Sequence, residues 1–132
     1  MGYIRRDARP TTLANQTTTQ RVYVDVAEFV NMGVQLGYDA SFAGTLKVYC
    51  SLSESQPDVT AAVALSNQYT TMATARLDDP EIVDGATGYT VTAGAAGVIA
   101  IDLQYNIVKW VCIEVVRTTG SYTLTYTKTN NG

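Results

Sequence analysis

The segment LDDPEIVDG holds the densest group of acidic side chains in the sequence, namely Asp78, Asp79, Glu81 and Asp84. Carboxylate oxygens are the ligands that Ca²⁺ prefers, although the spacing here is not that of an EF-hand loop. Asp beside Pro or Gly is also typical of turns, where the carboxylate caps backbone N–H groups. Because a turn needs no ligand spacing, we expect turn and capping residues, with calcium binding as the alternative, and no other cofactor.

Residue types on which many enzyme sites depend are missing. The sequence contains no histidine, which excludes Ser-His-Asp and Cys-His catalysis, a histidine general base and histidine-ligated metals. Paired carboxylates also hydrolyse glycosides, but no aromatic cluster accompanies the acidic group to line a sugar cleft. The GAAG at 94–97 is a small-residue turn outside the context of a phosphate-binding loop. We therefore expect no enzymatic activity.

The two cysteines, Cys50 and Cys112, fall inside predicted strands and far from CxxC spacing. Such thiols behave as small buried hydrophobes, and a disulfide between them is the alternative. The start MGYIRRDARP has no apolar h-region of the kind that directs secretion. No run reaches the roughly 18 apolar residues of a membrane span. We expect a soluble protein that folds in a cytoplasm and has no membrane partner.

Charge is scarce and unevenly distributed along the chain. Charged residues make up 16% of the sequence, against about 25% in typical soluble domains. Residues 1–21 carry a net charge of +3 and the remainder −6. An acidic body argues against nucleic acid as a partner, because phosphates are neutralised by clustered Lys and Arg. A surface so poor in charge is typical of proteins that pack against neighbours, although a Thr-rich β-protein alone has a similar composition.

Alternation of apolar and polar residues predicts β-strands over most of the chain. The 132 residues suffice for one domain, of which residues 1–20 lack periodicity and are expected to form an extended N-terminal arm. Only the segment 59–65, preceded by Asp58 as a cap, has the spacing of a short helix. About eight short strands with close turns in 21–132 predict an all-β fold, an antiparallel β-sandwich of jelly-roll or discoidin-like type.

The segment 109–129 is predicted to be a β-hairpin whose first strand is apolar on both faces. Its turn is expected at Gly120, where a positive φ is easily adopted. Val111, Ile113 and Val115 point to one face, so the other face needs a cover. Leaving that face in water would forgo several kcal/mol at roughly 25 cal/mol per Å². The cover is either a loop of the same chain, such as 54–76, or a second subunit.

We assign this second face to contact between subunits. The side chains of the expected oligomer interface are Trp110, Cys112, Glu114 and Val116. A buried carboxylate without a partner is costly, so Lys109 or Arg117 of a neighbouring subunit is expected to pair with Glu114. The Thr-covered strand 120–129 would lie beside this interface, at its rim.

Two stretches resemble small β-sandwich accessory proteins of tailed-bacteriophage particles. The first lies within 44–53 and the second within 105–129. The matching positions are Gly44, Thr45, Leu46, Val48 and Ser51, then Trp110, Val111, Ile113, Arg117, Thr118, Gly120, Ser121, Thr123 and Leu124. Such proteins are capsid decoration (cement), head-fibre or other accessory components, and many are trimers. The resemblance implies self-association, with a trimer favoured, docking on a capsid lattice, and no reaction.

We therefore expect a non-enzymatic virion structural protein, assembled in the host cytoplasm, that docks on the major capsid protein or another virion protein. The expected arm contacts with the capsid are Arg5, Arg6 and Arg9. Two alternatives remain. A tail or head-completion protein would share the fold and differ in copy number. A glycan- or host-surface-binding module would need an exposed aromatic platform, for which the candidates are Tyr38, Phe42, Tyr69 and Tyr89.

Overall fold

The protein is an antiparallel β-sandwich in the computed structural model, which describes residues 10–27, 31–57, 69–104 and 108–129. These ranges hold eleven strands and no helix, which confirms the predicted fold class, and so no helix that could cross a membrane occurs in them. The strands are β1 (Thr11–Gln16), β2 (Gln20–Asp25), β3 (Asn31–Tyr38), β4 (Ala43–Ser51), β5 (Thr70–Thr71), β6 (Thr74–Arg76), β7 (Asp79–Val83), β8 (Tyr89–Val91), β9 (Gly97–Gln104), β10 (Trp110–Thr119) and β11 (Tyr122–Thr129). The helix expected at 59–65 lies outside the described residues.

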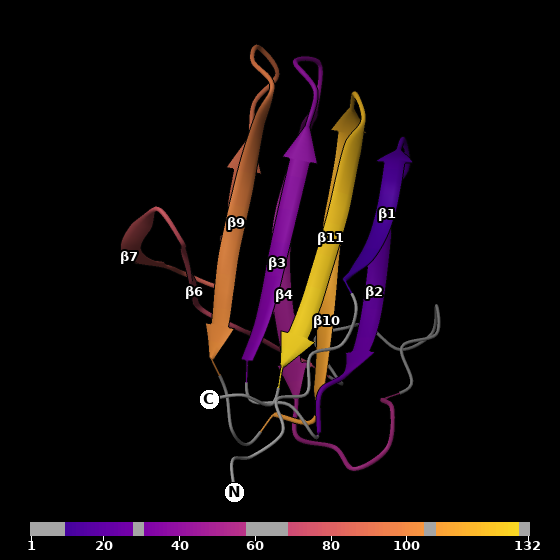
Figure 1. The fold of residues 1–132 in the computed structure, drawn as a ribbon, viewed down its shortest axis with the longest axis vertical. Helices are drawn as coiled ribbons and strands as arrows, with labels where there is room; N and C mark the ends of the chain where they lie inside the picture. The colour runs from indigo at the N-terminus through magenta and orange to yellow at the C-terminus, as the bar shows by residue number, and fades with distance from the viewer. Residues whose placement is uncertain (1–9, 28–30, 58–68, 105–107, 130–132) are drawn as a thin grey trace, which may run out of the picture.

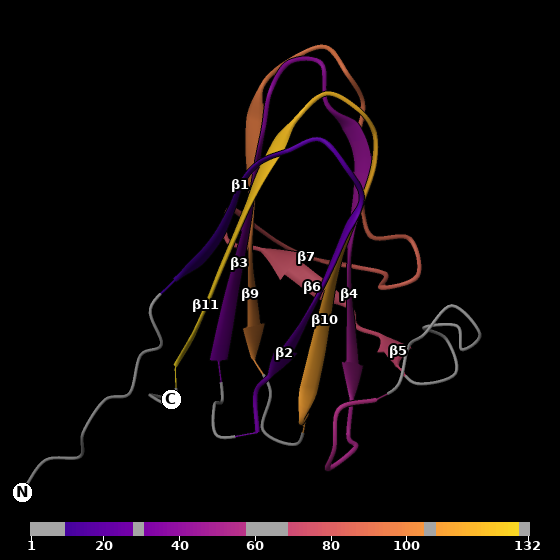
Figure 2. The same cartoon turned by 90° about the vertical axis from the view of Figure 1, so that its right-hand side faces the viewer.

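The strands form two facing sheets (Figure 1 and Figure 2). Sheet A has the order β1-β11-β3-β9-β6-β7, and sheet B has the order β2-β10-β4-β5, with β8 also paired to β4. Without β5, β6 and β7 the orders are β1-β11-β3-β9 and β2-β10-β4-β8. Every connection among these eight strands, except that from β4 to β8, passes from one sheet to the other. This is the jelly-roll order of two Greek keys.

The core lies between the sheets, because alternate side chains of each strand point inward and those positions are apolar. Leu36 and Ile101 of sheet A are fully buried, and so are Leu46, Val111 and Ile113 of sheet B. They belong to one continuous apolar cluster. The period-two pattern of the sequence therefore identifies correctly which side chains enter the core.

The predicted hairpin at 109–129 is wrong in its pairing. β10 lies between β2 and β4 in sheet B, whereas β11 lies between β1 and β3 in sheet A, so the turn is an arch between sheets. Gly120 has a φ of 75°, as expected, and a Cβ there would lie 2.3 Å from the backbone N of Phe42. Asp39 accepts hydrogen bonds from the backbone N–H and hydroxyl of Ser121 at 3.3 and 2.8 Å, and these bonds lower the pKa of Asp39. Alternation identifies which face of a strand is buried, not which strand is its neighbour.

The predicted arm at 1–20 is too long. Residues Thr11–Gln16 form β1, which pairs with β11 at the edge of sheet A, and Tyr122 donates a hydrogen bond to the carbonyl of Thr18 at 2.7 Å. The sandwich thus includes half of the expected arm, while residues 1–9 lie outside the described ranges. Most of β1 is exposed on both faces, and a strand of that kind shows no alternation in sequence.

An insertion between β4 and β8 adds β5, β6 and β7, which accounts for the excess over eight strands. β6 pairs with β9 and β7 with β6, so this hairpin extends sheet A and projects at its side (Figure 1). Its turn is at Leu77 and Asp78. Pro80, expected in a turn, lies instead in β7, an edge strand, where a residue without an N–H is tolerated.

Candidate interaction surfaces

The outer face of β10 differs strongly in exposure along the strand. Cys112 is fully buried and Glu114 is 6% exposed, whereas Val116 is 40% exposed and Trp110 is half-buried. All four side chains alternate with the inward-facing ones, as predicted. The central part of this face is therefore covered by other residues of the same chain.

Three tyrosines surround the buried thiol of this face. Cys112 pairs with Tyr23 of β2 on one side and with Tyr49 of β4 on the other. The ring of Tyr69, just before β5, lies 5.9 Å from that of Tyr23 and is 4% exposed. Tyr69 belongs to the range 54–76, the expected intrachain cover, so the chain supplies at least part of that cover itself.

The carboxylate of Glu114 has partners within its own chain. Arg21 donates from Nε to Oε2 at 2.6 Å, and Tyr49 donates from its hydroxyl to Oε1 at 3.2 Å. The Arg21 side chain is 50% exposed, so the pair lies at the margin of the buried region. The expected partners, Lys109 or Arg117 of a neighbouring subunit, are therefore not needed. Sequence reasoning missed Arg21 because it stands at the junction of the supposed arm and the first strand.

The environment of this face raises the pKa values of Cys112, Tyr49 and Arg21, which favours their protonated forms. Burial, together with the nearby charge of Glu114, raises the pKa of the Cys112 thiol to about 12. Burial likewise raises the pKa of Tyr49 to about 12, while the hydrogen bond with Glu114 raises the pKa of Arg21. Cys50 packs against the core on the opposite face of sheet B, and both cysteines are free thiols. A thiol of high pKa is a poor nucleophile, so this arrangement favours packing over chemistry.

Only the two ends of the outer face of β10 are exposed enough to contact a partner. Trp110 and Val116 lie on either side of the buried Cys112 and Glu114 along β10. A subunit contact over this face stays a prediction, and its contacts would be made mainly by Trp110 and Val116. The expected arm contacts, at Arg5, Arg6 and Arg9, lie outside the described residues.

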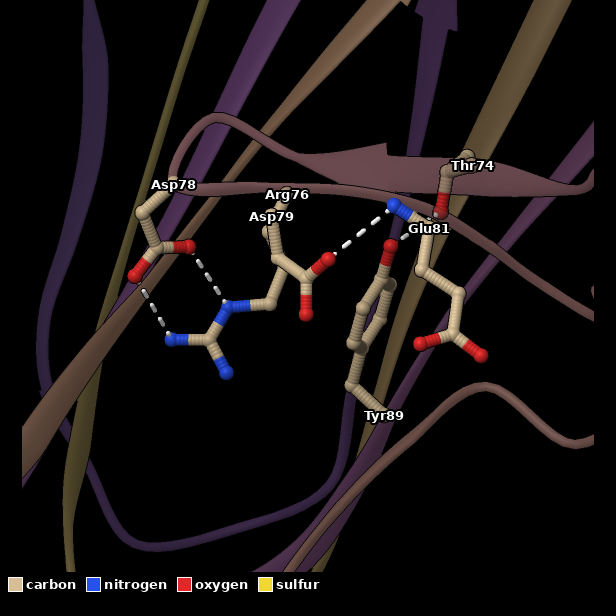
Figure 3. A network of polar contacts seen from close by, with 6 residues as sticks. All are labelled: Thr74, Arg76, Asp78, Asp79, Glu81 and Tyr89. Carbon is tan, nitrogen blue, oxygen red and sulfur yellow. Dashed lines mark hydrogen bonds and ion pairs between the residues drawn. The ribbon is translucent and has the colours of Figure 1, made fainter.

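Three of the four acidic residues in LDDPEIVDG have a local role, and Figure 3 shows those of Asp78 and Asp79. Arg76 donates from Nε to Asp78 at 3.0 Å, Asp79 accepts from the backbone N–H of Glu81 at 3.0 Å, and Asp84 accepts from that of residue 86 at 3.1 Å. Within the described ranges, no group of three or more acidic or cysteine side chains converges on a metal-sized space. Pairing with Arg76 and capping of backbone N–H groups account for Asp78, Asp79 and Asp84.

A buried hydrogen bond fixes the hairpin to the sandwich. The hydroxyls of Thr74 in β6 and Tyr89 in β8 lie 2.8 Å apart, and both residues are buried (Figure 3). Because β6 belongs to sheet A and β8 to sheet B, this bond connects the two sheets beneath the hairpin. It also satisfies two hydroxyl groups that would be costly to bury alone.

An exposed apolar surface accompanies this hairpin. Leu77 and Ile82 are 69% and 67% exposed and line a depression of about 400 Å³ with Asp102. A second depression, of about 190 Å³, is lined by Leu77, by Gly33 of β3 and by Pro10. Sequence reasoning missed this surface, because both apolar residues stand among acidic residues whose pattern indicates turns.

The aromatic residues expected to form a sugar-binding platform do not form one. Phe42, Tyr69 and Tyr89 are buried, at 0%, 4% and 8% exposure. Tyr38 packs its ring 5.6 Å from that of Phe42, against the core. These four residues therefore do not form the exposed platform that a glycan-binding module would need.

Comparison with known proteins gives one informative result. Neither protein-family models nor curated protein sequences match the chain. The crystal structure of the SPBc2 prophage-derived protein YomS is similar, with a TM-score of 0.69 and 16% sequence identity. The likeness covers 98% of this chain and 97% of that chain. At this identity the comparison shows that the two proteins share a fold.

Proposed function

We propose that this chain is a non-enzymatic structural protein of a bacteriophage particle, in particular a capsid decoration or accessory protein. The observation that carries the proposal is the likeness to a prophage-derived protein over nearly the full length of both chains. The jelly-roll topology adds support, since this fold is common among viral capsid proteins. The lack of any histidine and the scarcity of charge are consistent with a packing role.

In this proposal the protein self-associates and docks on the major capsid protein or another virion protein. Among the residues that the structure describes, Trp110 and Val116 on the outer face of β10 are the proposed contacts with a second copy. A trimer is the favoured assembly. Arg5, Arg6 and Arg9 contribute positive charge for docking on the particle. A surface with so few charges loses little favourable solvation free energy when another protein covers it.

The test is the copy number of this chain in purified particles of the phage whose genome encodes it. Quantitative mass spectrometry against the major capsid protein is expected to find the chain in a simple ratio to the capsid lattice. A few copies per particle would instead assign it to the tail or to head completion. Its absence from particles that carry all other structural proteins would reject a virion role, and a phage-encoded enzyme serves as the negative control.

A further inference from the structure

The edge of sheet B formed by β2 is the longest unbroken edge strand in the described part of the chain. β2 has β10 as its neighbour on one side and no described strand on the other (Figure 1). Its pairing with β10 runs through six consecutive residues without a shift in register. A regular edge strand of this kind presents a row of unpaired N–H and C=O groups to another chain.

The other sheet edges carry features that hinder such pairing. β1 has a bulge between Leu13 and Gln16, where Asn15 adopts a φ of 50°. β7 contains Pro80, which has no N–H to donate, and β5 and β8 are only two and three residues long. Bulges, prolines and short edge strands protect proteins against edge-to-edge association. β2 has none of these features, so it is the described edge best suited to binding another strand.

A hydrogen bond next to β2 fixes which of its backbone groups face outward. The N–H of Val26 donates to the carbonyl of Lys109 at 2.9 Å. Backbone groups alternate between the two sides of an antiparallel strand, so Val24 also directs its N–H and C=O to β10. The residues whose backbone groups point away from β10 are Arg21, Tyr23 and Asp25. The carbonyl of Asp25 accepts from Lys128 Nζ at 2.6 Å, and a carbonyl oxygen has a second lone pair.

We propose that β2 pairs with β2 of a second copy, antiparallel and about a two-fold axis at Tyr23. In this register Tyr23 lies opposite Tyr23 of the second copy, and Arg21 lies opposite Asp25. The three outward-facing residues of each copy then form hydrogen-bonded pairs, and each pair exchanges both of its N–H···O bonds. Sheet B continues from one copy into the other.

The side chains of β2 are complementary to themselves in this register. Arg21 and Asp25 are both exposed, and their opposite charges meet on each side of the two-fold axis. Arg21 uses its Nε for Glu114, and its guanidinium has further N–H donors. On the inner face, Val22 is half-buried and lies opposite Val24 of the second copy, which covers it further. This self-complementarity favours a second copy over an unrelated strand.

The contact is small and differs from the contact proposed on the outer face of β10. Interfaces below about 1,200 Å² are typical of transient complexes, so we expect β2 pairing at millimolar concentration and not in dilute solution. A two-fold contact joins copies in pairs, and so it cannot build a trimer, although it can link neighbouring trimers. The inference does not depend on the proposed function, because it follows from the edge and sequence of β2 alone.

Disulfide trapping between two variants tests the register. Arg21→Cys and Asp25→Cys are each made in a Cys50→Ala background, in which the remaining native thiol, Cys112, is buried. The two new cysteines lie directly opposite each other, at a Cα separation of about 5.5 Å that a disulfide can bridge. Two copies of the same variant place their cysteines roughly 14 Å apart along the strands. At millimolar concentration, the mixture is expected to form disulfide dimers at least tenfold faster than either variant alone.

Amide hydrogen exchange, measured by NMR, tests the contact without new cysteines. As the concentration approaches the millimolar range, the amides of Arg21, Tyr23 and Asp25 are expected to exchange severalfold more slowly. The amide of Val24, which already bonds to β10, is expected to keep its rate. Asp25→Lys places a like charge opposite Arg21 and is expected to abolish the slowing. Asp102→Lys is the matched control, because Asp102 is exposed on β9 of the other sheet.

Three outcomes would overturn the proposal. The first is a mixture of the two cysteine variants that forms dimers no faster than each variant alone, with circular dichroism showing that both are folded. The second is exchange of the three outward-facing amides that does not change up to millimolar concentration. The third is slowing that persists in Asp25→Lys, which would show that the strands do not meet in the self-complementary register.

Discussion

Arg21 and Glu114 face each other on neighbouring strands, with the Nε of Arg21 2.6 Å from Oε2 of the carboxylate. This pair allows Glu114 to lie 6% exposed on the outer face of β10. Hydrogen bonds to charged groups contribute about 1.5–3 kcal/mol. Because Arg21 is half exposed, solvent screening reduces that contribution.

Arg21→Ala is therefore expected to lower the free energy of unfolding by about 1–2 kcal/mol, since it leaves a buried carboxylate without its cation. In a Glu114→Gln background, where no buried charge remains, the same change is expected to lower the free energy of unfolding by clearly less. Urea unfolding of the two single variants and the double variant gives this coupling energy. If the changes in free energy of unfolding of the two single variants simply add up to that of the double variant, the interaction between Arg21 and Glu114 contributes nothing to stability.

The buried thiol gives a prediction about pH and reactivity. The pKa of Cys112 is about 12 in the folded protein, above the roughly 8.5 of an unfolded cysteine. The folded state therefore holds this proton more tightly. The resulting contribution to the free energy of unfolding is fully present below about pH 8.5 and is lost as the pH rises towards 12. In a Cys50→Ala variant, a thiol reagent at pH 8 is expected to modify Cys112 only as fast as the protein unfolds. Rapid modification in the folded state would contradict the burial of this side chain.

Truncation separates the arm from the sandwich. Removal of residues 1–9 is expected to lower the melting temperature by no more than about 4 °C, because all eleven described strands remain. Removal of residues 1–16 deletes β1 and uncovers β11, and it is expected to lower the melting temperature by more than 10 °C, an amount that reflects roughly 3 kcal/mol or more. Equal decreases in melting temperature for the two truncated forms, measured by differential scanning calorimetry, would show that β1 contributes little to stability.

Subunit contact through β10 is best tested at Val116, because this side chain is 40% exposed and its replacement does not disturb the core. Val116→Lys is expected to reduce the mass measured by light scattering to that of a monomer. Val98→Lys is the control, since Val98 is 53% exposed on β9 of the other sheet. A wild type that is already monomeric at micromolar concentration would reject a stable oligomer.

Calcium gives a simple test of the acidic hairpin. Because Asp78 pairs with Arg76 and Asp79 caps a backbone N–H, neither calcium nor EDTA is expected to move the melting curve. A shift of more than a few degrees with calcium would show that the carboxylates converge on an ion. Magnesium at the same ionic strength is the control for a general salt effect.

The sequence allows the strands and their buried faces to be predicted, because both depend on alternation within a few residues. Leu46, Val111 and Ile113 are buried as that pattern predicts. Strand partners depend on contacts between distant segments, and so the pairing of β10 with β2 and β4 was not predictable from alternation. The edge strand β1 was missed because its exposed residues carry no pattern.

The candidate surfaces were predicted less completely, for a related reason. The apolar residues on both faces of β10 correctly indicate that both faces of this strand are buried over its central part. Whether a tyrosine or a second subunit supplies the cover depends on where β2, β4 and Tyr69 lie. The apolar hairpin surface at Leu77 and Ile82 depends on β6 adding to the edge of sheet A, and no local pattern encodes such an addition.

The strand order has a consequence for how the chain reaches its native state during synthesis. β1 and β3 are neighbours only through β11, and β2 and β4 only through β10. The first four strands therefore have no partners among themselves, and both sheets remain open in the middle until the last quarter of the chain leaves the ribosome. Pairing over such long sequence separations makes folding slow. We expect the nascent chain to depend on chaperones until β10 and β11 insert, and an early stop codon before Trp110 to yield no folded fragment.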